Sequence, residues 1–347
     1  MKINKSMQTN SFLFWLRNAR WIALPQSILP ALLAITLAAV QSSTFSWYLA
    51  VFALLGVIFG HLGINLWDDY FDYKKSDQAV RDRLNSNGIR ARIVKCTYLT
   101  SGEANLKQLF WVATIFCFAS LVLGTVIFIE RGIFVEKAGY WILVIALITA
   151  FLGISYSGFP FRFSYHGLGE IVIGLVFGPL LMMGVYIATC GDFSLQLVFI
   201  SIPVGLLVTN IVYTHSVIDF EADKAMEKKT LAVILKQKNR MNIVSFIILF
   251  SPFITILTGV ILVILPVVYL FTFIALFHAI YLFKLILDFQ KGEKATIAPR
   301  RWMGPMERWA GITTAGIDWF MIRWYMARNL LMLFSLLIII ISITLTF

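Results

Sequence analysis

The feature that most constrains this chain is a series of long apolar runs separated by short polar segments. A membrane-spanning helix needs roughly 20 mainly apolar residues, and at that length the sequence contains about nine candidates. The runs do not alternate in polarity as the strands of a membrane barrel do. We therefore predict an all-α, polytopic membrane protein in a single domain, residues 1–347. The expected spans lie near residues 21–41, 46–68, 107–129, 140–157, 168–190, 194–216, 242–262, 264–287 and 327–346.

The overall composition supports a membrane protein. Hydrophobic residues make up 59% of the chain and charged residues only 14%, and the mean hydropathy is +0.83. The net charge of +11 is spread over the gaps between runs rather than gathered in one patch, which favours a lipid environment and no nucleic-acid partner. The three cysteines are widely separated, so they predict neither a disulfide framework nor a zinc site.

The distribution of lysine and arginine predicts how the chain crosses the membrane. These residues collect before the first run and after the second, fourth, sixth and eighth. The positive-inside rule then places the amino terminus in the cytoplasm and the carboxyl terminus outside, in the cytoplasmic (inner) membrane. The polar, basic start has no signal-peptide pattern and is expected to be retained.

The segment 300–329 is rich in Trp and Arg and too polar to span. We expect an interfacial loop with a short amphipathic helix leading into the last span, with a partner-binding surface as the alternative.

Two acidic clusters occur where apolar runs end on the predicted cytoplasmic side. The stretch NLWDDYFDY closes the second run, and HSVIDFEADKAMEKKTLAV follows the sixth. Each contains two aspartates four residues apart, a spacing that a helix stacks on one face. The pairs are Asp68 with Asp72 and Asp219 with Asp223, and Asp69 and Asp77 lie close enough to join the first pair.

Clustered carboxylates at the carboxyl end of a helix call for a positive partner, because the helix dipole is unfavourable to anions there. Carboxylates that leave room for water and phosphate oxygens are the usual ligands of Mg²⁺. One such cluster alone is most simply a solvated loop, but two on the same side favour a site. We therefore expect an enzyme for a ligand with a diphosphate head and a hydrocarbon tail, in which Mg²⁺ helps the diphosphate leave.

Several motifs resemble the UbiA superfamily of intramembrane aromatic prenyltransferases. The stretch WLRNARWIALPQSILPALLA is similar to the family's opening, and NLWDDYFDYKKSD resembles NLxNDYxDxxxGxD. SYSGFPFRFSYHGLGEIVIGLVFGPLLMMGVY resembles the YxGGPxPxxYxGLGE and FGP motifs of the menaquinone-pathway branch, the dihydroxynaphthoate polyprenyltransferases. The second acidic cluster resembles RDxxxDxxxGKxTLA. The resemblance extends from about Trp15 to Leu235.

This resemblance implies a ring-like bundle of nine helices with an active site on the cytoplasmic side. It also implies Mg²⁺-dependent transfer of a polyprenyl group from polyprenyl diphosphate to an aromatic acceptor, 1,4-dihydroxy-2-naphthoate in menaquinone biosynthesis. The implied catalytic residues, which with Asp77 also hold Mg²⁺, are Asp68, Asp72, Asp219 and Asp223. The implied substrate-binding residues are Arg20, Asn65, Asp69, Lys74, Asp77, Tyr156, His215 and Lys228.

Some individual roles have alternatives. Tyr156 is either a pocket residue or an interface anchor, and His215 either acts on the acceptor hydroxyl or forms a structural hydrogen bond. His61 and His278 lie within apolar runs, where we expect packing roles.

Departures from the family motifs leave the acceptor open to hydroxybenzoate, haem or a lipid alcohol. Asp68 replaces an Asn, and Ile218 and Glu227 replace an Arg and a Gly. A transporter or a catalytically silent membrane protein is the alternative of another class. Transporters place ionisable residues near the bilayer midplane, whereas the acidic clusters here lie at run ends, which favours an enzyme.

Overall fold

The apolar runs form helices throughout the part of the chain that is described. The computed structural model describes residues 12–75, 96–132, 138–225, 228–292 and 297–345, and Asp77 lies outside these ranges. Within them, eight helices are long and apolar enough to cross a membrane, and a ninth apolar helix, α3, has 17 residues. Each of the nine overlaps one of the nine predicted runs, which confirms a polytopic, nearly all-helical fold.

The long helices follow one another with short connections. Their bounds are α3 Pro25–Gln41, α4 Trp47–Lys75, α7 Leu106–Arg131, α8 Ala138–Ser157, α9 Gly169–Leu175 continuing through η3 Val176–Leu180 into α10 Leu181–Cys190, α11 Leu195–Ile218, α14 Lys238–Ile261, η4 Val267–Ala275 continuing into α15 Leu276–Gln290, and α17 Asp318–Thr344.

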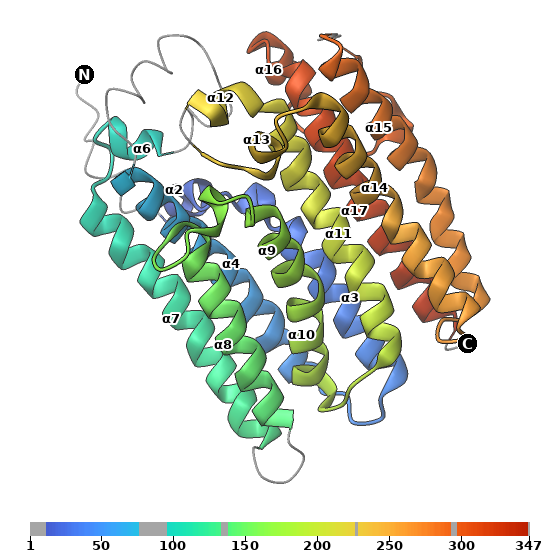
Figure 1. Cartoon of the computed structure of the whole chain (residues 1–347). Helices are drawn as coiled ribbons and strands as arrows, with labels where there is room; N and C mark the ends of the chain where they lie inside the picture. Colours follow the sequence, from blue (N-terminus) through green and yellow to red (C-terminus); the bar gives the residue numbers. More distant parts are fainter. Residues whose placement is uncertain (1–11, 76–95, 133–137, 226–227, 293–296, 346–347) are drawn as a thin grey trace.

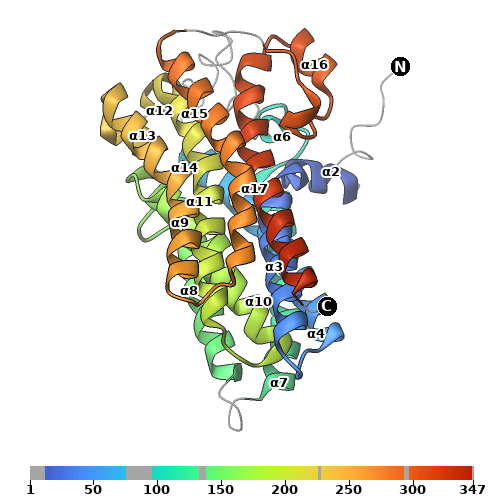
Figure 2. The same ribbon diagram turned by 90° about the vertical axis from the view of Figure 1, so that its right-hand side faces the viewer.

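Short helical segments occupy the connections. They are α2 Phe12–Asn18, η1 Trp21–Ala23, α6 Thr97–Thr100, η2 Phe163–Tyr165, α12 Phe220–Ala225, α13 Leu231–Leu235, η5 Arg301–Met303 and α16 Trp309–Thr314. Figures 1 and 2 show α2, α6, α12, α13 and α16 gathered toward one end of the bundle. That end also holds the last turns of α4 and α11, which carry the two acidic motifs.

Small residues bring the site-forming helices close together. At the crossing of the α9–η3 segment with α11, a Cβ added to Gly178 would lie 2.5 Å from Cα of Gly205. A Cβ on Gly205 would in turn lie 2.5 Å from the carbonyl oxygen of Gly174. Small residues allow such close backbone approach in membrane bundles. The end of α9 and the η3 turn are therefore fixed against the middle of α11.

The last helix begins earlier than predicted. It starts at Asp318 rather than near residue 327, because two arginines of the predicted loop are buried and have partners. Nε of Arg323 donates to the Leu285 carbonyl at 2.8 Å, and Arg328 donates to Glu307 at 2.9 Å. The prediction of a loop with a short helix is wrong for residues 318–329, whereas α16 lies in the remaining part.

Candidate functional site

The carboxyl-terminal turns of α4 carry the first acidic motif on an unbroken helix. The helix continues to Lys75, so Asn65, Asp68 and Asp72 occupy one face, as predicted. Asp69 is the next residue after Asp68 and projects about 100° away around the helix. The four polar side chains therefore divide into two groups with different surroundings.

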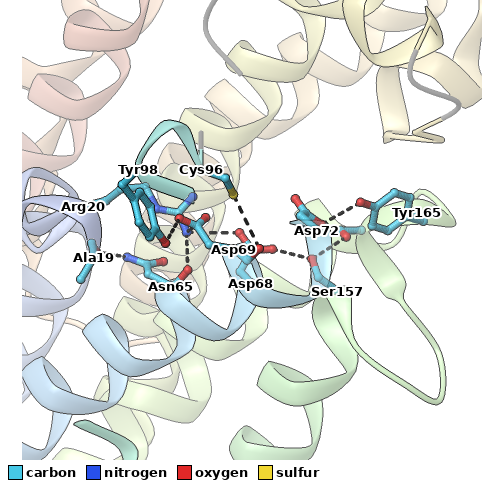
Figure 3. A network of polar contacts seen from close by, with 11 residues as sticks. Ala19, Arg20, Asn65, Asp68, Asp69, Asp72, Cys96, Tyr98, Ser157 and Tyr165 are labelled. Atoms are coloured by element: carbon cyan, nitrogen blue, oxygen red, sulfur yellow. Dashed lines mark hydrogen bonds and ion pairs between the residues drawn. The ribbon is translucent and has the colours of Figure 1, made fainter. Parts of the chain in front are cut away.

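Arg20 joins the amino-terminal segment to this end of α4. It lies between α2 and η1 with a left-handed backbone (φ 59°), which aims its guanidinium at the motif. Nη2 donates to the Asn65 carbonyl at 2.7 Å and contacts Asp68 Oδ2 at 3.2 Å and Asp69 Oδ1 at 3.3 Å (Figure 3). Burial disfavours the cation, but the Asp69 and Asp68 carboxylates outweigh it and raise the pKa of Arg20.

Asp69 points into a buried network rather than along the Asp68–Asp72 face. Its side chain is only 3% exposed, and its Oδ2 accepts a hydrogen bond from the Tyr98 hydroxyl at 3.1 Å. The thiol of Cys96 contacts its backbone carbonyl at 3.6 Å. Burial, together with the Asp69 charge, raises the pKa of Tyr98, so this phenol remains a donor. Asp69 therefore fixes α6 and Arg20 in place.

The end of α8 and the loop that follows it supply hydrogen-bond donors to the carboxylates of Asp68 and Asp72. The Ser157 hydroxyl donates to Asp68 Oδ1 and lies 3.1 Å from the Ser164 hydroxyl. The Tyr165 hydroxyl donates to Asp72 Oδ1 at 2.7 Å. Figure 3 shows the two aspartates between the Arg20 group on one side and Tyr165 on the other. Both carboxylates are thus oriented by donors from other segments.

The second acidic motif does not lie on one continuous helix. The main run of α11 ends at Ile218, Asp219 forms the turn, and α12 begins at Phe220. The Asp223 amide still donates to the Asp219 carbonyl at 2.8 Å, which keeps the two residues one turn apart. Asp223 is fully buried, whereas the Asp219 side chain is 11% exposed. The predicted stacking on a single helix is therefore wrong at Asp219.

His215 lies beside Asp219, the less buried residue of that pair. Its Nε2 lies 3.7 Å from Asp219 Oδ2, and its ring packs edge-on against Phe320 at 5.0 Å between centroids. Both roles predicted for His215 stay predictions, and the structure adds its position beside Asp219.

Tyr165 connects the two acidic motifs. The buried Lys228 places its Nζ 5.2 Å from the centre of the Tyr165 ring, whose hydroxyl binds Asp72. The Lys228 amide donates to the Asp223 carbonyl at 2.9 Å. Lys229 forms a parallel bridge with His166, next to Tyr165. The α8–α9 loop therefore lies between α4 and the α12–α13 connection.

Glu170 ties the same connection to the start of α9. Its carboxylate is buried and accepts hydrogen bonds from the Ser216 hydroxyl at 2.8 Å and the Leu231 amide at 3.2 Å. Because Leu231 opens α13, this carboxylate fixes the segment that carries Lys228.

The remaining predicted residues take more peripheral positions. Lys74 is exposed and lies over the ring of Tyr70 at 5.3 Å, on its own helix. Tyr156 is half-buried, with its ring against the backbone of Gly169.

The sequence analysis did not identify Ser157, Tyr165 and Tyr98 as site residues, because their roles depend on tertiary contacts. Ser157 and Tyr165 fall in the motif shared with the menaquinone branch, which was the available signal. For Tyr98 the sequence offers none.

The oxygen donors fit a magnesium ion that binds together with its substrate. Within the described ranges, no three His, Cys, Asp or Glu side chains converge as a complete metal site. Mg²⁺ in proteins usually takes one or two carboxylates and completes its shell with water and substrate phosphates. Asp68 and Asp72, two carboxylates one turn apart on the same face of α4, match that pattern.

Comparison with known proteins places this arrangement in a family. Residues 27–311 match the model of the UbiA prenyltransferase family, and the chain belongs to that family. It is 26% identical over 224 residues, or 64% of its length, to the 1,4-dihydroxy-2-naphthoate octaprenyltransferase of Bacillus subtilis. It is 30% identical over 197 residues, or 56% of its length, to the 2-carboxy-1,4-naphthoquinone phytyltransferase of Synechocystis. The matches span 66% and 58% of these relatives, less than two thirds of each.

A solved structure shares the fold. A UbiA homologue from Archaeoglobus fulgidus, solved with DMAPP and Mg²⁺, superposes with a TM-score of 0.56 at 16% identity. The superposition covers 92% of this chain and 99% of the homologue. At this identity the likeness establishes the helical architecture alone.

Proposed function

We propose that this protein is a prenyltransferase that moves a polyprenyl group from polyprenyl diphosphate to 1,4-dihydroxy-2-naphthoate. The observation behind the proposal is that Tyr165 connects the two acidic motifs. Its hydroxyl donates to Asp72, and its ring lies against the Lys228 ammonium group. Two sets of carboxylates that are connected through Tyr165 and a buried lysine suit a diphosphate bound with Mg²⁺. The names of the two naphthoate-related relatives support this reading, as do the DMAPP and Mg²⁺ bound to the homologue from Archaeoglobus fulgidus.

In this proposal the aspartates on the two sides have equivalent tasks. Asp68 and Asp72 hold Mg²⁺ from α4, with Asp77 beyond the described part of that segment, and Asp219 and Asp223 hold it from α11 and α12. When bound, Mg²⁺ neutralises the diphosphate and makes it a better leaving group. Lys228 and Arg20 donate to phosphate oxygens, and Lys74 attracts the anion from the helix end.

Other residues position the site residues or contact the acceptor. Asn65 fixes Arg20 and the end of α2 by donating to the Ala19 carbonyl at 3.0 Å. Asp69 acts through Arg20 rather than on substrate, because its carboxylate oxygens contact Arg20 and Tyr98. Tyr156 and His215 are assigned to the acceptor side.

The protein would be a multi-pass component of the cytoplasmic membrane with its amino terminus and both acidic motifs in the cytoplasm. The unequal distribution of Lys and Arg supports this orientation. A membrane-impermeant thiol reagent should label an added cysteine at residue 10 only after inside-out vesicles are formed. Labelling in intact cells would reverse the orientation.

The activity is tested by incubating membranes containing the protein with labelled prenyl diphosphates and a panel of acceptors, then identifying products by mass. Asp72→Asn and Asp219→Asn should each abolish Mg²⁺-dependent transfer while the protein stays folded in detergent. Asp192→Asn is a matched control, because Asp192 is an exposed aspartate in the α10–α11 connection. Full transfer by both site variants would refute the assignment of the diphosphate site.

A further inference from the structure

A buried histidine lies in the middle of α4, away from the polar contacts described so far. His61 is 8% exposed, and its Nδ1 lies 2.7 Å from the hydroxyl of Ser27 on α3. The same ring contacts Phe177 at 5.1 Å between centroids. An ionisable residue within a membrane-spanning segment is a candidate functional residue, because a purely apolar residue would be less costly there.

The Ser27 contact defines which ring nitrogen carries the hydrogen. The Ser27 hydroxyl also lies 3.0 Å from the Leu24 carbonyl, which can only accept. Since the hydroxyl has one hydrogen and gives it to Leu24, the hydrogen between Ser27 and His61 must come from Nδ1. In the neutral ring, Nε2 then carries a lone pair and accepts a hydrogen bond.

This Nε2 is available to a ligand. Among the described residues Nε2 has no hydrogen-bond partner, and it is not fully enclosed by other atoms. It therefore retains accessible surface within a residue that is otherwise packed. The sequence-based expectation of a packing role accounts for the ring and Nδ1, but it leaves Nε2 without a function.

The position of His61 on α4 relates this nitrogen to the acidic motif. His61 precedes Asn65 by four residues and Asp68 by seven, so the three share one face. Seven residues of helix correspond to about 10 Å toward the middle of the bilayer. A prenyl diphosphate held at these carboxylates would extend its hydrocarbon tail away from the helix end, into the apolar bundle. His61 thus lies on the side of the motif where the tail would enter, about two turns deeper than Asp68.

The neighbouring segment supports a ligand site at this depth. Phe177 belongs to a π-helical turn, Val176–Leu180, between α9 and α10. π-Helical turns within α-helices occur frequently at functional sites. This turn places an aromatic ring beside the imidazole, and an aromatic ring suits a planar aromatic ligand.

We propose that His61 binds the acceptor by taking a hydrogen bond from a ring hydroxyl on Nε2. Ser27 orients the imidazole, and the Phe177 ring lies alongside the aromatic substrate. This inference rests on the proposed function, since it identifies the acceptor as a hydroxylated aromatic ring. His61 is therefore a determinant of acceptor specificity.

The test compares His61→Asn with wild type in membranes containing the full chain. The asparagine amide can still donate to Ser27 from near the Nδ1 position, but it has no atom at Nε2. We expect the kcat/KM for the acceptor to fall about tenfold while the KM for prenyl diphosphate stays unchanged. His61→Gln places an amide oxygen near Nε2 and should recover part of the loss. His278→Asn controls for loss of a histidine from another membrane-spanning helix, where His278 is half-buried.

Inhibition by matched acceptor analogues tests the hydrogen bond to His61 Nε2 directly. A naphthalene carrying free hydroxyls should inhibit wild type about tenfold better than His61→Asn, whereas its dimethyl ether should inhibit both equally. Equal inhibition of the two proteins by the hydroxylated compound, or an unchanged kcat/KM in His61→Asn, overturns the inference and leaves the prenyl transfer intact. Wild-type protein that transfers to no hydroxylated arene overturns the proposed function itself, and this inference with it.

Discussion

Removal of the Arg20 guanidinium tests the network that positions the first acidic motif. Arg20→Met keeps most of the side-chain volume but removes the cation that contacts both Asp68 and Asp69. Asp68 can turn toward Ser157 or solvent, since its side chain is 13% exposed. Asp69 cannot, because it is 3% exposed and retains only the neutral Tyr98 donor among its side-chain contacts described above. The variant therefore removes a cation that lies 3.3 Å from a buried carboxylate.

The expected cost follows from that burial. Removing one partner of a fully buried ion pair typically costs about 3–5 kcal/mol. The Arg20 side chain is 35% exposed, so solvent already screens part of the interaction, and we expect about 2–4 kcal/mol. The asymmetry between the two aspartates predicts that Asp69 accounts for most of this loss.

Thermal unfolding of the purified protein in detergent measures the effect. Arg20→Met should unfold several degrees below wild type. The double variant Arg20→Met/Asp69→Asn should recover most of the difference, because the buried charge of Asp69 is then removed as well. Arg17→Met is the matched control, since Arg17 is an exposed arginine of α2, and it should change the midpoint little. A double variant no more stable than Arg20→Met would refute the reasoning, because the penalty would then not come from Asp69.

Three further perturbations test other parts of the structure. Tyr165→Phe removes the hydroxyl that binds Asp72 but keeps the ring beside Lys228, so the KM for prenyl diphosphate should rise about tenfold. The control Tyr140→Phe, at an exposed position, should leave that KM unchanged. Gly205→Ala should lower the unfolding midpoint, since its Cβ would lie 2.5 Å from the Gly174 carbonyl oxygen, whereas Gly124→Ala, with no atom within 4 Å, should not. Burial raises the pKa of Glu307, but the hydrogen bond and charge of Arg328 outweigh burial, so the net effect is a lowered pKa. The carboxylate therefore stabilises the fold above about pH 4.3, and this contribution is lost as the pH falls through the pKa of the folded state. The difference in midpoint between wild type and Glu307→Gln should accordingly shrink at low pH, and a constant difference would exclude the ion pair.

The course of the helices was predictable because membrane insertion acts on local composition. Each apolar run of roughly 20 residues became a helix at its own position, since no other structure satisfies the backbone in lipid. The exception is α17, whose first turns contain Arg323 and Arg328. Hydropathy excludes such residues from a helix of this kind. Only the tertiary partners, the Leu285 carbonyl and Glu307, make their burial favourable.

The candidate site was predictable in its residue types but not in its connections. The spacing of Asp68 and Asp72 correctly placed them on one face of α4. The adjacent Asp69 has the same charge and an equally acidic sequence context, yet it lies in a network with Tyr98, which is 29 residues away in sequence. Spacing describes directions around one helix, whereas the partner on each side depends on which other segments pack there.

The link through Tyr165 explains how two acidic motifs on separate helices can act on one ligand. The α4 motif is fixed by Arg20 from the amino-terminal side and by Ser157 and Tyr165 from the α8–α9 loop. The second motif is held to that same region, because Glu170 at the start of α9 binds Ser216 and the first amide of α13. A change that moves the α8–α9 loop would therefore displace both sets of carboxylates together rather than alter the distance within either pair. For a diphosphate that must be held from both sides, this connection is a stronger constraint than the number of acidic residues in either motif.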